Sequence, residues 1–271
     1  MMNLPKVPEG VLVPNLILLG YRGSISHNMY IPNTDPNSVD DIDLIGVFLA
    51  SPDFYIGVKD PDVPKKLQEK GTREIKKVID GVLWDCVYYE LRKFVTLLLK
   101  GNPNVMSFLW IKREHYLDIA KHGEMILQNR YAFLGKDRLY ESFTGYAHGQ
   151  ALKMEHFQTE GYMGKKRKRL VRKYGYDISQ AAHVIRILLT GTELLKTGDM
   201  EVFRTKDVDM LLDIKRGNWS LEDVKKLAEK LFKEAEVEYK RSTLPEKADY
   251  HRANIMAINI LGDYLNRGRI L

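Results

Sequence analysis

LILLGYRGS at residues 16–24 is followed by DDIDLIGVFL at residues 40–49. The first apolar run predicts a strand that ends in a Gly-Ser turn, and the second predicts a strand that begins at a pair of acids. Because strand side chains alternate between faces, Asp41 and Asp43 point the same way while Ile42 points into a core. Two carboxylates so close together are unfavourable unless a cation lies between them. The pattern therefore indicates metal-dependent phosphate chemistry.

The composition favours a globular protein. The chain has 271 residues, of which 44% are hydrophobic and 29% are charged, so it is long enough for one large domain or two small ones. The net charge of +6 and the isoelectric point near 9.1 allow a polyanionic partner such as RNA, DNA or a nucleotide. They do not require one, because many basic proteins bind no nucleic acid.

Membrane and secretory signals are missing from the sequence. No apolar run reaches the roughly 20 residues that span a bilayer, and residues 1–6 contain no apolar segment of the signal-peptide type. Cys86 is the single cysteine, so no intramolecular disulfide can form and a zinc site built from cysteines is not expected. We expect a cytoplasmic protein with neither a membrane nor a disulfide partner.

The first part of the chain is predicted to form strands and loops. The strand candidates are residues 15–20, 42–50, 72–79 and 82–88. Asp80-Gly81 separates the last two and is a two-residue hairpin signal. Residues 26–37 and 59–70 are rich in proline and polar side chains and are predicted to be loops.

Helices are predicted to dominate the rest of the chain. The candidates, chosen by apolar spacing and by caps such as Gly101, Gly198 and Ser220, are residues 91–99, 104–110, 137–158, 177–196, 220–241 and 247–266. The sequence therefore predicts an α+β fold with a small mixed β-sheet core and flanking helices, followed by a mostly helical part. We place the catalytic core in residues 1–110 and the helical domain in residues 111–271.

Asp85 is the best third ligand for a metal site. It lies in the middle of the apolar stretch LWDCV, and a buried carboxylate without a partner costs several kcal/mol, so it usually has a partner or a metal. If its strand lies beside the Asp43 strand, the acids converge with Asp41 and hold Mg²⁺ or Mn²⁺ ions on a nucleotide's phosphates. Such paired ions are about 3.5–4 Å apart, and Asp85 would also help deprotonate an attacking hydroxyl. The alternative for Asp41 and Asp43 is ordinary turn chemistry.

The Gly23-Ser24 turn supplies the complementary part of a nucleotide site. Glycine lets the backbone approach a phosphate closely, and the serine hydroxyl and backbone N–H groups donate to its oxygens. Arg22 adds positive charge. An ordinary surface loop is the alternative interpretation of this turn.

The order Gly-Ser, then Asp-x-Asp, then an acid in a third strand resembles the DNA polymerase β-like nucleotidyltransferase superfamily. Further motifs resemble its RNA-ligase-associated branch, whose members are predicted RNA-repair nucleotidyltransferases. These motifs are YYELRKF at residues 88–94, KGNPN at 100–104, GYAHGQ at 145–150, GYD at 175–177 and AHVIR at 182–186. The resemblance covers roughly residues 15–200. It implies that Asp41, Asp43 and Asp85 bind metal and that an NTP is the substrate.

Two departures from the branch pattern are visible. Tyr21 stands where the branch often has serine, so the phosphate turn is formed either by Gly23-Ser24 or by a turn centred on Gly20. Ser179 and Gln180 stand where the branch has an early helical lysine.

The helical half contributes further candidates for nucleotide binding. Tyr146, Gln150 and Lys153 share one helix face, and His183 and Arg186 share another. The resemblance implies that these faces line the nucleotide or acceptor cleft. The alternative for His183 is a hydrogen-bonded core residue.

The densest positive run is a candidate for nucleic-acid contact. It comprises Lys165, Lys166, Arg167, Lys168 and Arg169. Such a run binds a phosphate backbone, with the flanking Tyr162 and Tyr174 available for stacking. The alternative is a solvated helix face or loop.

Together these features predict a metal-dependent nucleotidyltransferase that moves an NMP from an NTP to a hydroxyl, with release of pyrophosphate. The resemblance and the basic run favour an RNA end as the acceptor. The alternatives are transfer to a small molecule or a protein, or a catalytically idle RNA-binding module. The identity of the NTP, the acceptor and the oligomeric state stay open.

Overall fold

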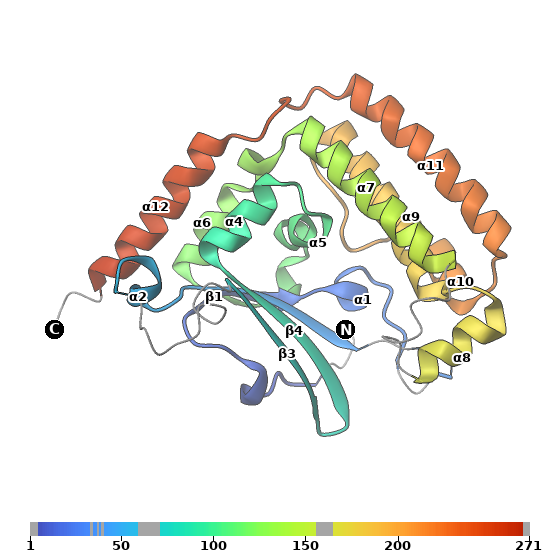
Figure 1. The fold of residues 1–271 in the computed structure, drawn as a ribbon, viewed down its shortest axis with the longest axis horizontal. Helices are drawn as coiled ribbons and strands as arrows, with labels where there is room; N and C mark the ends of the chain where they lie inside the picture. Colours follow the sequence, from blue (N-terminus) through green and yellow to red (C-terminus); the bar gives the residue numbers. More distant parts are fainter. Residues whose placement is uncertain are drawn as a thin grey trace.

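The computed structural model describes residues 5–32, 35–36, 38, 41–58, 71–155 and 165–267. A five-stranded sheet lies at its centre, with strand order β3-β4-β2-β1-β5 (Figure 1). The strands are β1 (Leu16–Tyr21), β2 (Ile42–Phe48), β3 (Thr72–Ile79), β4 (Val82–Glu90) and β5 (Tyr116–Ile119). β2 and β4 pair in parallel and the other pairs are antiparallel, so the sheet is mixed.

The hairpin between β3 and β4 fixes the position of Lys76 relative to Asp85. Asp80 has φ 52° and Gly81 has φ 77°, the positive values that a type I′ turn requires at both central positions. Its register places Lys76 opposite Asp85. The parallel pairing of β2 with β4 places Asp43 opposite Asp85 on the other side.

Helices cover one face of the sheet and shorter segments cover the other. α4 (Leu91–Leu99) and α6 (Lys121–Gln128) pack on the first face, next to α5 (Pro103–Met106) and the 3-10 turns Ser107–Trp110, Arg113–His115 and Arg130–Phe133. The second face forms a smaller core with residues from the 3-10 turn Glu9–Val11 and from α2 (Pro52–Tyr55). Within this smaller core Cys86 is buried as a free thiol.

Of the remaining helices, all but the last in the chain form a layer beside the sheet, and the last packs over α4 and α6 (Figure 1). They are α7 (Lys136–Glu155), α8 (Lys165–Tyr174), α9 (Ile178–Thr197), α10 (Val208–Arg216), α11 (Leu221–Arg241) and α12 (Tyr250–Arg267). α9 is central and packs against α7, α10 and α11, while α12 returns to α4. Asp177 caps the start of α9 by accepting a hydrogen bond from Gln180 N, and Gly198 ends it with φ 71°.

The predicted fold class is confirmed, since the sheet is mixed, has flanking helices and is followed by a mostly helical part. The predicted loop at residues 59–70 lies outside the described residues, as do residues 33–34 and 37 of the loop predicted at 26–37. β5 pairs with β1 beyond residue 110, and the division of the chain at that residue stays a prediction. In the described part, no helix is long and apolar enough to cross a membrane. The cytoplasmic location also stays a prediction.

Several elements escaped the sequence analysis, among them α2, α6 and α8, and for β5 and α10 the physical reason is clear. β5 has four residues and its two central side chains are exposed, so it carries no alternating apolar pattern. α10 lacks a side-chain N-cap, because the carboxylate of Asp207 accepts hydrogen bonds from Arg204 instead. Both elements exist because of tertiary contacts.

Candidate active site

The chain turns sharply where β1 ends. Arg22 N donates to Asp43 O at 3.0 Å, and Gly23 follows with φ +61°. A Cβ atom at Gly23 would lie 2.2 Å from Asp43 Oδ2, so no other residue fits without moving the carboxylate. Gly23 begins the single-turn helix α1 (Gly23–Ser26), and Met29 N donates to Ser24 O at 2.8 Å to close the loop. The turn is therefore built directly against Asp43.

The two glycines considered for the phosphate turn lie in different surroundings. Gly20 is part of β1, and a Cβ there would meet Phe108, Ile111 and the His115 carbonyl at 2.9 Å. Glycine is therefore needed at position 20 because a side chain there would disturb the packing of the fold. Gly23 and Ser24 line a cavity, which favours them as the turn that a phosphate approaches.

The three predicted acids lie next to one another, with two cations between them. Arg22 Nη2 is 3.4 Å from Asp43 Oδ1 and 3.3 Å from Asp85 Oδ1. Lys76 Nζ is 2.9 Å from Asp85 Oδ2 and 3.7 Å from Asp41 Oδ2. The carboxylates are 25–29% exposed, so they are reachable from solvent. These ion pairs balance the crowded negative charge.

The donor chemistry of this cluster fits a hard cation. Carboxylate oxygens are the ligands that Mg²⁺ and Mn²⁺ prefer. Arg22 Nε is buried without a hydrogen-bond partner among the described residues, so the bridging guanidinium is incompletely satisfied in its present position. Within the described residues, no group of three or more His, Cys, Asp or Glu side chains is already arranged to hold a metal ion. Arg22 and Lys76 would have to move for the acids to close on one.

A cavity of about 370 Å³ opens beside the acids and the turn. Arg22, Gly23, Ser24, Asp41 and Asp43 line one wall. Positive side chains from α8, α9 and α10 line the opposite wall, namely Arg167, Arg186 and Lys215. The volume falls within the range typical of small-molecule sites. Its two walls therefore differ in charge.

Two of the cations on that wall are buried. Arg186 is 4% exposed, and its Nη2 lies 2.9 Å from His183 Nδ1. Burial lowers the pKa of Arg186 to about 9, yet the group remains charged at neutral pH. Lys215 is 6% exposed and donates to Met29 O at 2.8 Å. Among the described residues no carboxylate pairs with Arg186, so the wall has positive charge available for an anion.

The predicted nucleotide-binding residues on the helices divide into two groups. Tyr146, His183 and Arg186 line the cavity. Gln150 is absent from the lining and accepts a hydrogen bond from Gln180 Nε2 at 2.8 Å, so it supports a residue that does line the cavity. Lys153 is exposed and does not line the cavity.

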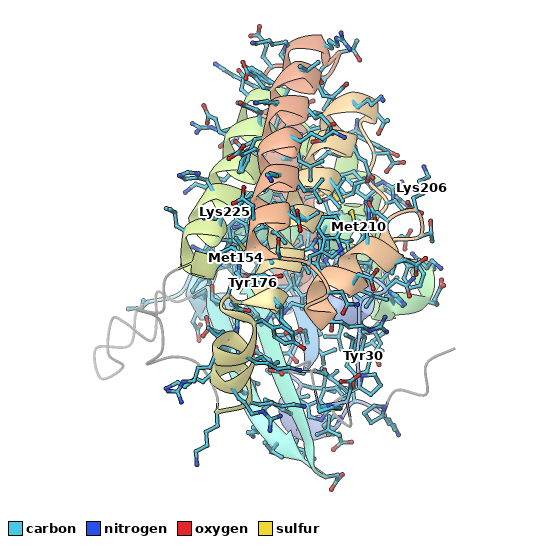
Figure 2. All side chains as sticks on the ribbon, turned by 90° about the vertical axis from the view of Figure 1, so that its right-hand side faces the viewer. Tyr30, Met154, Tyr176, Lys206, Met210 and Lys225 are labelled. Carbon is cyan, nitrogen blue, oxygen red and sulfur yellow. The ribbon has the colours of Figure 1, made fainter. Side chains whose placement is uncertain are left out.

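The predicted nucleic-acid run forms α8, and its residues have different surroundings. Arg167 lines the cavity and pairs with Asp177 at 2.6 Å. Lys166 and Arg169 donate to the carbonyls of Asp35 and Pro36. Lys165 is exposed and Lys168 is partly exposed. In Figure 2, which faces this side of the molecule, α8 lies below Tyr176 with side chains directed outward.

Several residues of the site were not predicted. Lys215 belongs to the unpredicted α10, where it follows the buried Leu211 by one turn. Asn104 and Ser179 also line the cavity. Lys76 had a usable signal, because the Asp80-Gly81 turn sets the hairpin register and so pairs position 76 with position 85.

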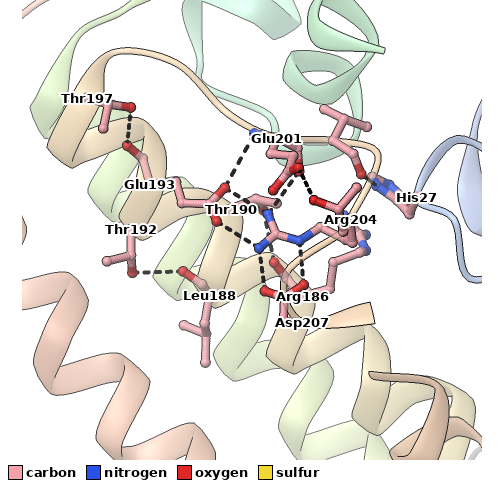
Figure 3. A network of polar contacts seen from close by, with 12 residues as sticks. His27, Arg186, Leu188, Thr190, Thr192, Glu193, Thr197, Glu201, Arg204 and Asp207 are labelled. Carbon is pink, nitrogen blue, oxygen red and sulfur yellow. Dashed lines mark hydrogen bonds and ion pairs between the residues drawn. The ribbon is translucent and has the colours of Figure 1, made fainter. Parts of the chain in front are cut away.

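A buried polar network fixes α1 to the helical layer (Figure 3). Arg204 is 1% exposed and donates to the carboxylates of Glu193 and Asp207. Burial alone would lower its pKa, but the hydrogen bonds to these acids outweigh burial and raise it. The backbone of Arg204 bonds with His27 O and with Asn28 Nδ2. The network thus holds the end of α1 in place.

His27 belongs to the same connection. Its Nδ1 lies 3.0 Å from Val202 O and therefore donates to it. Burial, followed by the positive charge of Arg186, lowers the pKa of His27 well below its usual value, so the ring is neutral. A neutral ring with a single donor matches the carbonyl it faces.

A known protein family matches most of the chain. Residues 34–259 match the family described as RlaP, the RNA repair pathway DNA polymerase beta family. The match includes Asp41, Asp43 and Asp85 and begins after the Gly23-Ser24 turn. None of the curated proteins matches the chain.

A solved structure is also similar to the chain. It is a nucleotidyltransferase-like protein from Exiguobacterium sibiricum 255-15, with 10% sequence identity and a TM-score of 0.27. The similarity covers 95% of this chain and 76% of that chain. The family match extends over most of the sequence and confirms the resemblance predicted from the motifs. The chain belongs to the RNA repair pathway DNA polymerase beta family, a nucleotidyltransferase-like family.

Proposed function

We propose that the protein is a metal-dependent nucleotidyltransferase that moves an NMP from an NTP to a hydroxyl acceptor. One observation carries this proposal. A single cavity joins Asp41, Asp43 and the Gly23-Ser24 turn to the buried cations Arg186 and Lys215. Carboxylates on one side suit a divalent cation, and the buried positive charge of Arg186 and Lys215 on the other suits phosphate.

Each part of the site has a proposed role. Asp41, Asp43 and Asp85 hold Mg²⁺ or Mn²⁺, which supplies charge neutralisation for the phosphates when bound. Gly23 and Ser24 offer backbone N–H groups and a hydroxyl to phosphate oxygens. Arg22, which is partly buried, and Lys76, which is exposed, pair with these acids and would release them to a metal ion.

The proposed reaction forms a bond between the acceptor oxygen and the α-phosphorus. The bond from the α-phosphorus to the bridging oxygen breaks, and pyrophosphate leaves with both electrons of that bond. The hydroxyl proton passes to a carboxylate, for which Asp85 is proposed because it lies beside Asp43 across β2 and β4. Positioning by the cavity walls supplies much of the rate enhancement in such transfers.

We propose an RNA end as the acceptor. The family is associated with RNA repair, and α8 carries exposed or partly exposed positive charge at Lys165, Lys168 and Arg172 close to the cavity residue Arg167. Positive side chains on one helix face bind a phosphate backbone.

Incubation with each α-labelled NTP, Mg²⁺ or Mn²⁺, and RNA, DNA, protein or aminoglycoside acceptors tests the proposal. We expect label to transfer to RNA, and we expect Asp43→Asn to reduce transfer at least about 100-fold because a metal ligand is lost. Asp118→Asn removes an exposed acid from β5 and is the matched control. Transfer by Asp43→Asn at the wild-type rate would contradict the metal assignment, and label on another acceptor would contradict the RNA assignment.

A further inference from the structure

A line of four polar side chains runs along the helical wall of the cavity. Asn104 comes from α5, Tyr146 from α7, and His183 and Arg186 from α9. Asn104 Nδ2 lies 3.1 Å from Tyr146 Oη, and His183 Nε2 lies 3.4 Å from the same oxygen. Arg186 Nη2 lies 2.9 Å from His183 Nδ1. All four residues line the cavity.

The arginine decides which nitrogen of His183 carries the hydrogen. A guanidinium has five N–H donors and no acceptor, so His183 Nδ1 must accept from Arg186 with its lone pair. Burial, and then the positive charges of Arg186 and Arg167, lower the pKa of His183 to about 3. The ring is therefore neutral, and its one hydrogen is on Nε2.

This tautomer of His183 sets the direction of its hydrogen bond to Tyr146. His183 Nε2 donates to Tyr146 Oη, and Asn104 Nδ2 donates to the same oxygen. A hydroxyl oxygen has two lone pairs and one hydrogen, so both lone pairs are used and the hydrogen is left over. No described residue accepts it. The ring of Tyr146 packs edge-on against His183, with centroids 5.7 Å apart, which holds the hydroxyl at the cavity wall.

We infer that Tyr146 donates its hydroxyl hydrogen to a phosphate oxygen of the bound nucleotide, and that Arg186 is a positioning residue that sets this direction through His183. The inference rests on the proposed function, since it assigns a contact within the same cavity. An oxygen that bears negative charge is the matching acceptor, because the nearby buried side chains Arg186 and Lys215 are cations. A ribose hydroxyl is the competing oxygen, and the test separates the two.

The ligand contact is tested by equilibrium binding of ATP, inorganic tripolyphosphate and adenosine to the metal-loaded protein. We expect Tyr146→Phe to weaken ATP and tripolyphosphate binding about tenfold, the usual effect of losing one hydrogen bond to a charged group, and to leave adenosine unchanged. Tyr140→Phe, on the same helix but outside the cavity lining, is the control. Equal tripolyphosphate binding by Tyr146→Phe and wild type, or a loss confined to adenosine, overturns the inference.

The positioning role is tested by the nitrogen-15 spectrum of His183 in the free protein. We expect a lone pair on Nδ1 and a hydrogen on Nε2 in wild type. Arg186→Lys retains a donor-only cation and should keep this tautomer. Arg186→Gln can also accept, so it should shift the hydrogen toward Nδ1 and weaken tripolyphosphate binding as Tyr146→Phe does. A wild-type spectrum with the hydrogen on Nδ1, or an unchanged tautomer in folded Arg186→Gln, overturns this role.

The two proposals fail differently. If the wild-type protein binds neither ATP nor tripolyphosphate, the proposed function is contradicted. The inferred contact between Tyr146 and a phosphate oxygen is then contradicted as well. If the wild type binds both and Tyr146→Phe binds them equally well, the proposed function stands and only the present inference fails. The tautomer of His183 is read without ligand, so it is independent of turnover.

Discussion

The left-handed backbone of Gly23 brings the chain against the Asp43 carboxylate, with room for a hydrogen and not for a methyl group. The conformation and the missing side chain therefore have separate consequences. The first affects stability, because a non-glycine residue in this conformation costs roughly 1–2 kcal/mol. The second affects the position of a proposed metal ligand.

Gly23→Ala is predicted to abolish nucleotidyl transfer and to weaken Mn²⁺ binding, because the new Cβ would lie 2.2 Å from Asp43 Oδ2 and displace it. Gly81→Ala is the matched control. Gly81 has φ +77° but no atom within 4 Å of an added Cβ, so its substitution carries the backbone cost alone. We expect both variants to lose roughly 1–2 kcal/mol in urea unfolding and only Gly23→Ala to lose Mn²⁺ affinity. Equal Mn²⁺ affinity in the two variants would contradict the role of Gly23.

Charge balance at the carboxylates is a second feature of individual residues. Lys76 comes from the edge strand β3 and reaches Asp85 and Asp41, while Arg22 reaches Asp85 and Asp43. The hydrogen bond to Asp85 is the main reason that the pKa of Lys76 is raised. These two cations offset part of the negative charge of the three acids and so reduce the repulsion among them.

At the scale of elements, the connection between α9 and α10 links the end of α1, which follows the Gly23-Ser24 turn, to the helical layer. Arg204 bonds Glu193 on α9 and Asp207 at the start of α10, and its backbone bonds the end of α1. The guanidinium of Arg204 lies at the centre of the network in Figure 3, and Arg204 is 1% exposed. Removal of one partner from such a network leaves buried charge without compensation.

Arg204→Met is predicted to lower the free energy of unfolding by about 3–5 kcal/mol, because Glu193 and Asp207 then lose their shared cation. Lys206→Met is the control, since Lys206 is exposed two residues away in the same connection. Urea unfolding measures both effects. In native-state hydrogen exchange, the Met29 amide, which closes the loop after α1, should also lose protection in Arg204→Met alone. Equal stability of the two variants would show that the network adds nothing.

At the scale of the whole molecule, charge is distributed differently over two exposed helices. α8 carries Lys165, Lys168 and Arg172 at helical spacing, beside the cavity residue Arg167. α11 lies on the outer side of the helical layer and mixes lysines with glutamates, as in the pair of Lys226 with Glu222 (Figure 1). Of these two helices, α8 is the one that carries positive charge without acidic residues and lies beside the proposed site.

Changing Lys165, Lys168 and Arg172 together to glutamine is predicted to weaken binding of single-stranded RNA and to reduce the slope of log K against log salt by roughly 2, since each phosphate contact contributes about 0.7. The matched control changes Lys226, Lys230 and Lys233 on α11, which removes the same charge from another helix. Titration of a labelled RNA at several salt concentrations measures the slope. An equal reduction in both triple variants would indicate that net charge is the cause. The basic run of α8 would then be an ordinary solvated helix face.

The candidate site was predictable to the extent that its signals are local. Strand periodicity, the Asp80-Gly81 turn and the Asp-x-Asp spacing depend on neighbours in the chain, and the corresponding strands formed as predicted. The helix at Ile178–Thr197 was likewise predicted, at residues 177–196, with Gly198 as its stop. Lys76 was missed although the hairpin register specified its place opposite Asp85.

Local patterns in the sequence were enough to predict the α+β fold class, the mixed sheet and the family, because these depend on periodicity, turn chemistry and motifs that act over short separations. The role of the three acids as metal ligands stays a prediction. Only the tertiary structure decided which cations face those acids and what lines the opposite wall. Lys215 reaches the carbonyl of Met29 across 186 residues of chain, on a helix whose first turn lacks a local cap signal. Contacts at such separation arise from packing of whole elements, and no short-range pattern encodes them.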